Sequence, residues 1–136
     1  MKFTIPGVPV GKGRPKFSTF NGHAVAYTPE KTVNYENLVK LSFQASGEEP
    51  FGRETQLKAI ILAYFPIPKS TSKKKREEMQ TDLILPTKKP DTDNIAKAIL
   101  DALNGVAYYD DAQVVELHVV KKYSEEPRAE VMIIDT

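Results

Sequence analysis

Five aspartates fall within the 21 residues from Asp91 to Asp111, and they restrict how this part of the chain can fold. Asp91 and Asp93 stand where a helix is expected to begin, Asp101 lies on that helix, and Asp110 and Asp111 follow in the next turn. Two carboxylates about 4 Å apart repel by roughly 4 kcal/mol at an effective dielectric constant of about 20. A divalent cation removes that repulsion, and a thiol-free oxygen ligand set suits Mg²⁺, Mn²⁺ or Ca²⁺. The alternative is that these aspartates only cap a helix and occupy solvent-exposed positions in a turn, without binding a metal.

The length and composition limit the class of protein. A chain of 136 residues predicts one domain, residues 1–136, with a sizeable core. Cysteine is absent, which excludes a disulfide framework, a zinc–thiolate site and a Cys–His pair, and the only histidines are His23 and His118. There is no signal-peptide core and no apolar run long enough to span a membrane, so we expect a cytoplasmic protein.

The net charge of +1 is unevenly distributed along the chain. Residues 1–29 carry four Lys or Arg side chains and no acid, residues 69–89 are mostly basic, and residues 105–136 are mostly acidic. Basic segments that flank an acidic cluster are what a metal-dependent enzyme needs to act on a polyanion. The cations that we predict to contact nucleic acid are Lys12, Arg14, Lys16, Lys73, Lys74, Lys75, Arg76, Lys88 and Lys89. For residues 73–76 the alternative is a solvated helix face.

Hydrophobic periodicity predicts the secondary structure. We expect strands over residues 2–10, 24–27, 55–65, 114–123 and 129–134, with a short extended piece over 83–85. Long helices are expected from residue 30 to about 46 and over 93–104, and Ser72 is expected to cap a short charged helix over 73–80. This order predicts an α/β (α+β) fold, in which two long helices pack on a face of one mixed sheet.

Two apolar stripes define the buried faces of the long helices. The first comprises Val33, Leu38, Leu41 and Ala45, with Tyr35 and Phe43 as additional contacts. The second comprises Ile95, Ala96, Ile99, Leu100 and Leu103, and Gly105 ends that helix. Core residues are also expected at Leu117, Val119 and residues 131–134 of the last two strands.

Lys97 has two interpretations. Asp93, Lys97 and Asp101 follow one another at intervals of four residues and therefore share one helix face. Lys97 is either the helix partner of Asp93, a pair worth about 0.2–0.5 kcal/mol, or the cation that meets a scissile phosphate. A calcium-binding EF-hand is excluded, because Ala96 occupies the position that requires glycine. The pattern favours phosphodiester hydrolysis in which Mg²⁺ activates a water and stabilises charge on phosphorus.

One pattern runs through the acidic region: Lys88-Lys89-Pro90-Asp91-Thr92-Asp93-Asn94, then Lys97, then Leu100-Asp101-Ala102-Leu103, then Tyr109-Asp110-Asp111-Ala112-Gln113-Val114-Val115. With these motifs, residues 86–122 resemble the RusA family of Holliday-junction resolvases, small endonucleases of bacteria and their phages. The resemblance implies a Mg²⁺-dependent homodimer that nicks four-way DNA junctions symmetrically during recombination and repair. It also implies that Asp91, Asp93 and Asp111 hold the metal and that Lys97 is catalytic.

Two other functions fit the same residues. One is a Mg²⁺-dependent nuclease for flaps or other branched DNA, and the other is a non-catalytic junction-binding module whose carboxylates hold a structural ion. The two equivalent strands of a four-way junction give a physical reason for a two-fold protein. The sequence alone does not identify the dimer interface, and it leaves open whether Asp101 and Asp110 bind metal.

Overall fold

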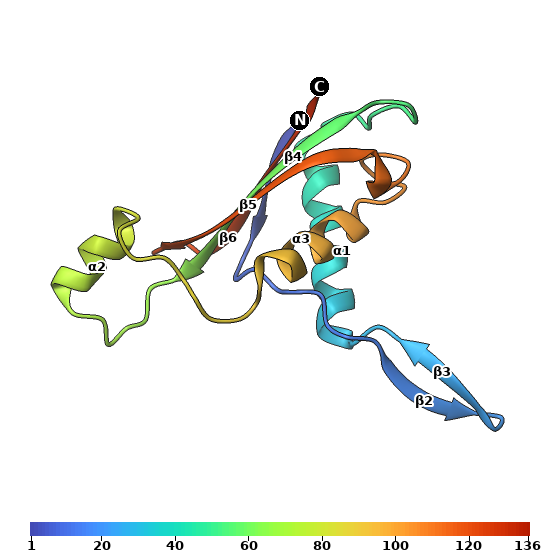
Figure 1. Ribbon diagram of the computed structural model, residues 1–136, viewed down its shortest axis with the longest axis horizontal. Helices are drawn as coiled ribbons and strands as arrows, with labels where there is room; N and C mark the ends of the chain where they lie inside the picture. The colour runs from blue at the N-terminus through green and yellow to red at the C-terminus, as the bar shows by residue number, and fades with distance from the viewer.

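The computed structural model describes residues 1–136, and it forms one four-stranded sheet, one separate two-stranded hairpin and three helices (Figure 1). In chain order the elements are β1 (Lys2–Pro6), β2 (Lys16–Phe20), β3 (His23–Tyr27), α1 (Glu30–Ser46), β4 (Leu57–Pro66), α2 (Lys73–Gln80), α3 (Thr92–Ala102), a 3₁₀ turn η1 (Asp111–Gln113), β5 (Val114–Ser124) and β6 (Arg128–Asp135). The α+β class is confirmed.

The main sheet has the strand order β1-β6-β4-β5 and is mixed, as predicted. β4 pairs in parallel with β5 and antiparallel with β6, and β6 pairs antiparallel with β1. Because β5 is an edge strand, one side of its backbone has no partner strand. The two long helices α1 and α3 contact each other and lie against the sheet (Figure 1).

The core lies between one face of this sheet and the two helices. β4 alternates between buried and half-buried residues, and its buried set is Leu57, Ala59, Ile61, Ala63 and Phe65. All five residues of the apolar stripe predicted for α3 are buried. The predicted short helix is also confirmed, since α2 covers residues 73–80 and the Ser72 side chain accepts a hydrogen bond from the Lys75 amide.

The prediction for the buried face of α1 is confirmed only in part. Tyr35 and Phe43 are buried and Leu38 is half-buried against the core, as expected. Val33, Leu41 and Ala45 are exposed instead, and the buried set also contains Thr32 and Val39. Apolar residues occur around the whole circumference of this helix, so periodicity alone did not fix the face that packs. Phe43 is held by an edge-to-face contact with Phe3 of β1, with ring centroids 5.7 Å apart.

Three further expectations need correction. Residues 83–85 are not extended, because the amides of Leu83 and Ile84 both donate to the Glu78 carbonyl and continue the turn that ends α2. Leu117 is exposed because β5 is an edge strand, and Ile134 is exposed because the face of the sheet opposite the helices is uncovered.

The sequence prediction found only one strand of the hairpin formed by β2 and β3. Its turn is Asn21-Gly22, and both residues have positive φ angles (52° and 79°). Asn-Gly between two stretches of strand-forming residues is a strong signal for a tight hairpin, because both central residues of such a turn need positive φ. The signal was therefore present in the sequence. None of the helices combines the length and the apolar character that crossing a membrane requires.

Candidate functional site

The entrance of α3 presents two carboxylates that have no partner. Asp91 is the N-cap residue, with extended backbone, yet its side chain makes no capping hydrogen bond. Asp93 lies in the first turn, and both residues are exposed. The free amides at a helix N-terminus favour negative charge there. Both carboxylates are therefore available to a ligand from outside this chain.

The loop that follows β1 packs directly against this entrance. The Lys12 amide donates to the Asn94 carbonyl at 2.9 Å. Gly11 approaches so closely that a Cβ at this position would lie 2.6 Å from the Cβ of Pro90. The N-terminal loop and the Asp91 segment are therefore far apart in sequence but form one surface.

A cleft of ≈ 790 Å³ lies between this loop, the start of α1 and the Asp91 segment. Asp91 and Asn94 line it on one side, and four basic residues, Lys12, Arg14, Lys31 and Lys89, also line it. Lys31 was not among the predicted nucleic-acid contacts, since it lies in a helix whose charges gave no distinctive pattern. The lining of the cleft thus combines basic residues with an aspartate, as binding of a phosphodiester through a metal requires.

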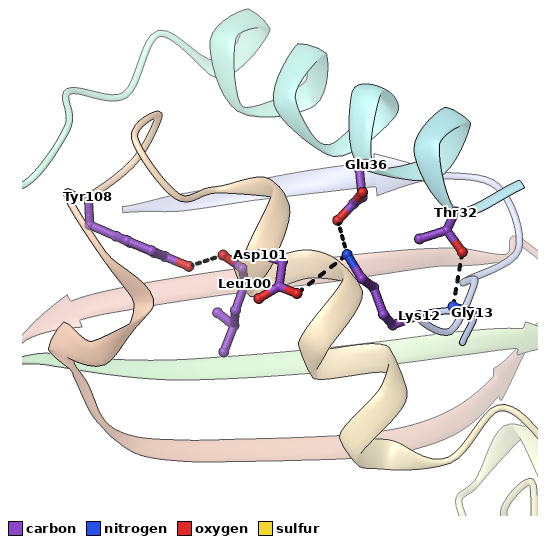
Figure 2. Close-up of polar contacts among 7 residues, drawn as sticks. All are labelled: Lys12, Gly13, Thr32, Glu36, Leu100, Asp101 and Tyr108. Atoms are coloured by element: carbon purple, nitrogen blue, oxygen red, sulfur yellow. Dashed lines mark hydrogen bonds and ion pairs between the residues drawn. The ribbon is translucent and has the colours of Figure 1, made fainter. Parts of the chain in front are cut away.

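Lys12 is the exception among these cations, because its ammonium group is engaged within the protein. Nζ lies 2.8 Å from Oε2 of Glu36 on α1 and 3.4 Å from Oδ2 of Asp101 on α3 (Figure 2). Partial burial lowers the pKa of Lys12, but the hydrogen bond and charge of Glu36, together with Asp101, outweigh it and raise the pKa. Lys12 thus ties the loop to both long helices, and Asp101 has a cationic partner.

The far end of α3 leads into the second acidic group. Here the Asp110 side chain accepts from the Ala112 amide at 3.2 Å, and the Asn104 side chain accepts from the Asp111 amide at 2.7 Å. The Tyr108 hydroxyl donates to the Leu100 carbonyl at 2.6 Å and fixes the turn against the helix (Figure 2). Asp110 therefore has a local structural role as the cap of η1.

Asp111 is the most perturbed carboxyl of this group. Burial raises its pKa to about 6, with further contributions from hydrogen bonding to Asp101 and Asp110 and from their negative charges. Carboxylates that share a small region in this way hold a proton more tightly, or bind a cation in its place.

The structure does not bring Asp91, Asp93 and Asp111 together within one chain. Asp111 neighbours Asp101 and Asp110, and Asp101 is ten residues along the helix from Asp91, about 15 Å at 1.5 Å per residue. No three Asp, Glu or His side chains of the chain are placed to hold one metal ion. The oxygen donors suit Mg²⁺ chemically, but a single chain does not assemble them.

Lys97 is exposed on α3 and forms no ion pair, so the predicted pairing with Asp93 is not present. Its ammonium group is free to meet an external anion. The helix-partner interpretation of Lys97 loses its support, and the role in catalysis stays a prediction.

The remaining predicted nucleic-acid contacts fall at two places. Arg14, Lys16, Lys88 and Lys89 are exposed around the cleft and the hairpin, and Lys73, Lys74 and Lys75 are exposed on α2. Arg76 is not free, since it lies 2.6 Å from Glu125 and also donates to the Pro68 carbonyl. α2 and the hairpin stand at opposite ends of the molecule (Figure 1).

Comparison with known proteins agrees with these observations. The family model described as "Endodeoxyribonuclease RusA" matches residues 6–134. The chain belongs to the RusA endodeoxyribonuclease family. It is also 46% identical over 136 residues to a Bacillus subtilis (strain 168) protein, "Uncharacterized protein YqaN", with 98% of this chain and 94% of that protein covered. The family is one of nucleases, and the matched range contains all five aspartates from Asp91 to Asp111.

Proposed function

We propose that this protein is a Mg²⁺-dependent endonuclease that resolves four-way DNA junctions by paired, symmetric nicks in recombination and repair. The observation that carries the proposal is the cleft that the unpartnered Asp91 lines together with Arg14, Lys31 and Lys89. Family membership supports nuclease chemistry, and the exposed cations support a polyanionic substrate.

Each residue has a role in this proposal. Asp91, Asp93 and Asp111 hold the metal, and Arg14 and Lys89 position the DNA backbone in the cleft. Lys97 donates to the scissile phosphate, where it stabilises the charge that develops in the transition state. Bound Mg²⁺ supplies an activated water and further stabilises that charge.

The separation of Asp111 from Asp91 favours a homodimer whose metal site takes residues from both subunits. α3 and β5 run in opposite directions: Lys121, near the end of β5, donates to the Lys88 carbonyl before α3, and the turn after α3 leads into the start of β5. A two-fold axis that pairs the free edges of two β5 strands brings the start of one beside the end of the other. The partner's Asp111 then approaches Asp91 and Asp93.

The exposed side chains of β5 support this edge as the interface. Val115, Leu117 and Val120 are 64%, 43% and 37% exposed, in a strand of 11 residues. An unpaired edge strand with exposed apolar residues readily pairs with a second chain. Antiparallel pairing of identical strands is also self-complementary, as two-fold symmetry requires.

The function is tested by cleavage of four-way, flap and linear duplex DNA, each with and without Mg²⁺. Paired nicks in the four-way substrate alone are the expected result. Preferential flap cutting identifies a nuclease for other branched DNA, and tight junction binding without cutting in Mg²⁺ identifies a binding module. Either of the last two results overturns the proposal.

The shared site is tested by mixing two inactive variants, Asp91→Asn and Asp111→Asn. If each site uses Asp91 from one chain and Asp111 from the other, a mixed dimer contains one wild-type site and one doubly altered site. Nicking activity should then return on mixing and exchange of subunits. If each site belongs to one chain, every site in the mixture carries a change, and no activity returns.

A further inference from the structure

The hairpin of residues 16–27, here called the β2–β3 arm, projects away from the body of the protein (Figure 1). All ten residues of its two strands are exposed, and apart from the pairing of these two strands residues 16–27 make no backbone hydrogen bond to the rest of the chain. An isolated two-stranded hairpin is only marginally stable in water. Its projection as a free arm therefore points to a role in contacting something else.

Large aromatic side chains are displayed on this arm. Phe17 and Phe20 are 72% and 68% exposed, and Tyr27 is 47% exposed. Strand pairing places Lys16 beside Tyr27 and Phe20 beside His23, and these four side chains share one face because they lie at alternating positions. One face of the arm therefore combines aromatic rings with a lysine and a histidine.

The chemistry of the arm favours nucleic acid over an apolar protein partner. No acidic residue precedes Glu30, whereas Arg14 and Lys16 lie at the base of the arm. Arg14 and Pro29, which flank the arm on either side, both line the cleft that contains Asp91. The arm is thus continuous with the surface on which DNA is proposed to bind. Aromatic rings interleaved with cations are typical of surfaces that stack on unpaired or end-exposed bases.

We propose that the β2–β3 arm is a base-stacking wedge that enters the branch point of the DNA substrate. The inference rests on the proposed function and names the feature of the DNA that the arm recognises. At a branch point the stacking of base pairs is interrupted, so an aromatic ring can cover an exposed base face. In a continuous duplex the same ring must first separate stacked bases, which costs a few kcal/mol per step. The arm therefore contributes to selectivity for branched DNA.

The test compares Phe17→Ser/Phe20→Ser with wild type for binding to four-way and linear duplex DNA of equal length. We expect affinity for the four-way substrate to fall by about ten-fold, the effect of removing base–aromatic stacking. Duplex affinity should change by less than about two-fold, because the cations remain. Phe20→Tyr keeps the ring and should bind as wild type. Leu41→Ala, which removes an apolar side chain 62% exposed on α1, is the matched control and should change neither affinity.

A fluorescent adenine analogue at the branch point gives a second readout. Wild type should change its emission, and the double variant should not, although the protein concentration saturates binding in both cases. An equal fall in four-way and duplex affinity overturns the wedge and leaves a non-selective contact. A shift of the variant from dimer to monomer in sedimentation also overturns it, because the arm then binds a second copy of the chain.

Failure of the wedge and failure of the proposed function give different results. If wild type shows no preference for four-way DNA, the proposed function fails. If wild type prefers four-way DNA and the double variant keeps that preference and the emission change, only the wedge is refuted. Thermal unfolding checks that the variants fold, and no change is expected because the aromatic rings are exposed.

Discussion

Asp111 is the carboxyl whose charge is most sensitive to its surroundings, and its raised pKa gives a pH-dependent prediction. The pKa is about 6 in the folded protein against an ordinary value of 3.8. Between these values the folded state keeps a proton that the unfolded state releases, so the free energy of unfolding falls as pH rises through this interval. Above about pH 6 the Asp111 carboxyl is ionised in both states, and its burial and its repulsion from Asp101 and Asp110 then destabilise the folded state to the full extent.

We therefore expect Asp111→Asn to raise the free energy of unfolding at pH 7 without divalent cation, and to have little effect at about pH 4. The amide keeps the size of the side chain without its charge. Urea unfolding at the two pH values measures the difference. A variant that is less stable than wild type at pH 7 contradicts the prediction. Added Mg²⁺ should stabilise wild type more than the variant, because only wild type retains all the ligands.

Lys97 gives the second prediction at this scale. Since it has no partner within the chain, Lys97→Ala should hardly change stability. If it meets the scissile phosphate, the rate of the chemical step should fall by about 10²–10³-fold, the usual effect of removing one transition-state donor. Lys97→Arg should rescue only part of the rate, because the guanidinium differs in reach and geometry. Single-turnover cleavage at saturating protein measures this rate, and near wild-type cutting by Lys97→Ala refutes the role.

At the scale of elements, the loop after β1 and the segment before α3 depend on a close backbone approach at Gly11. In Gly11→Ala the new Cβ would lie 2.6 Å from Pro90 and 3.3 Å from the Cβ of Asn94. Overpacking of this kind costs about 1–3 kcal/mol, and it must displace the segment that carries Asp91. We expect nicking to fall more than junction binding does. Gly52→Ala is the matched control, since its Cβ meets only Thr55 at 3.6 Å, an ordinary contact.

α2 carries the other predicted nucleic-acid contacts, and the role of its three exposed lysines in DNA binding can be tested. Replacing Lys73, Lys74 and Lys75 with Ala should weaken DNA binding with little effect on the fold. The dependence of log affinity on log salt concentration should flatten by about 0.9 for each duplex phosphate that the protein no longer neutralises. Lys2→Ala, at an exposed position on β1, is the control. An unchanged slope identifies residues 73–75 as a solvated helix face.

At the scale of the whole molecule, assembly decides whether the acidic groups act together. We expect Leu117→Lys to convert the proposed dimer to monomer and to reduce nicking, because the charge lies in the proposed β5 interface. The fold of the monomer should be kept, since Leu117 is already 43% exposed. Leu41→Lys on α1 adds the same charge at a position that is 62% exposed and should keep the dimer. Sedimentation velocity measures both, and a stable Leu117→Lys dimer places the interface elsewhere.

Much of the architecture could be predicted from the sequence because its signals are local. The stripe of α3, the Ser72 cap and the strand expected over residues 55–65 depend on residues close in sequence, and the structure confirms them. The face of α1 could be predicted only in part. Its stripe was placed on Val33 and Leu41, whereas Thr32 and Val39 are buried. The side of the helix that packs depends on contacts distant in sequence, such as that of Phe43 with Phe3, and no local pattern contains them.

In the candidate site, too, some properties follow from the sequence and others from the tertiary structure. The sequence by itself determined which groups are available: oxygen ligands suited to Mg²⁺, a lysine on the same helix face, and basic segments on either side. Tertiary structure decided their partners. It committed Lys12 to Glu36 and Asp101 and left Asp91, Asp93 and Lys97 free. It also separated Asp111 from Asp91 by the length of α3, because a helix advances about 1.5 Å per residue and its two ends cannot meet within one chain.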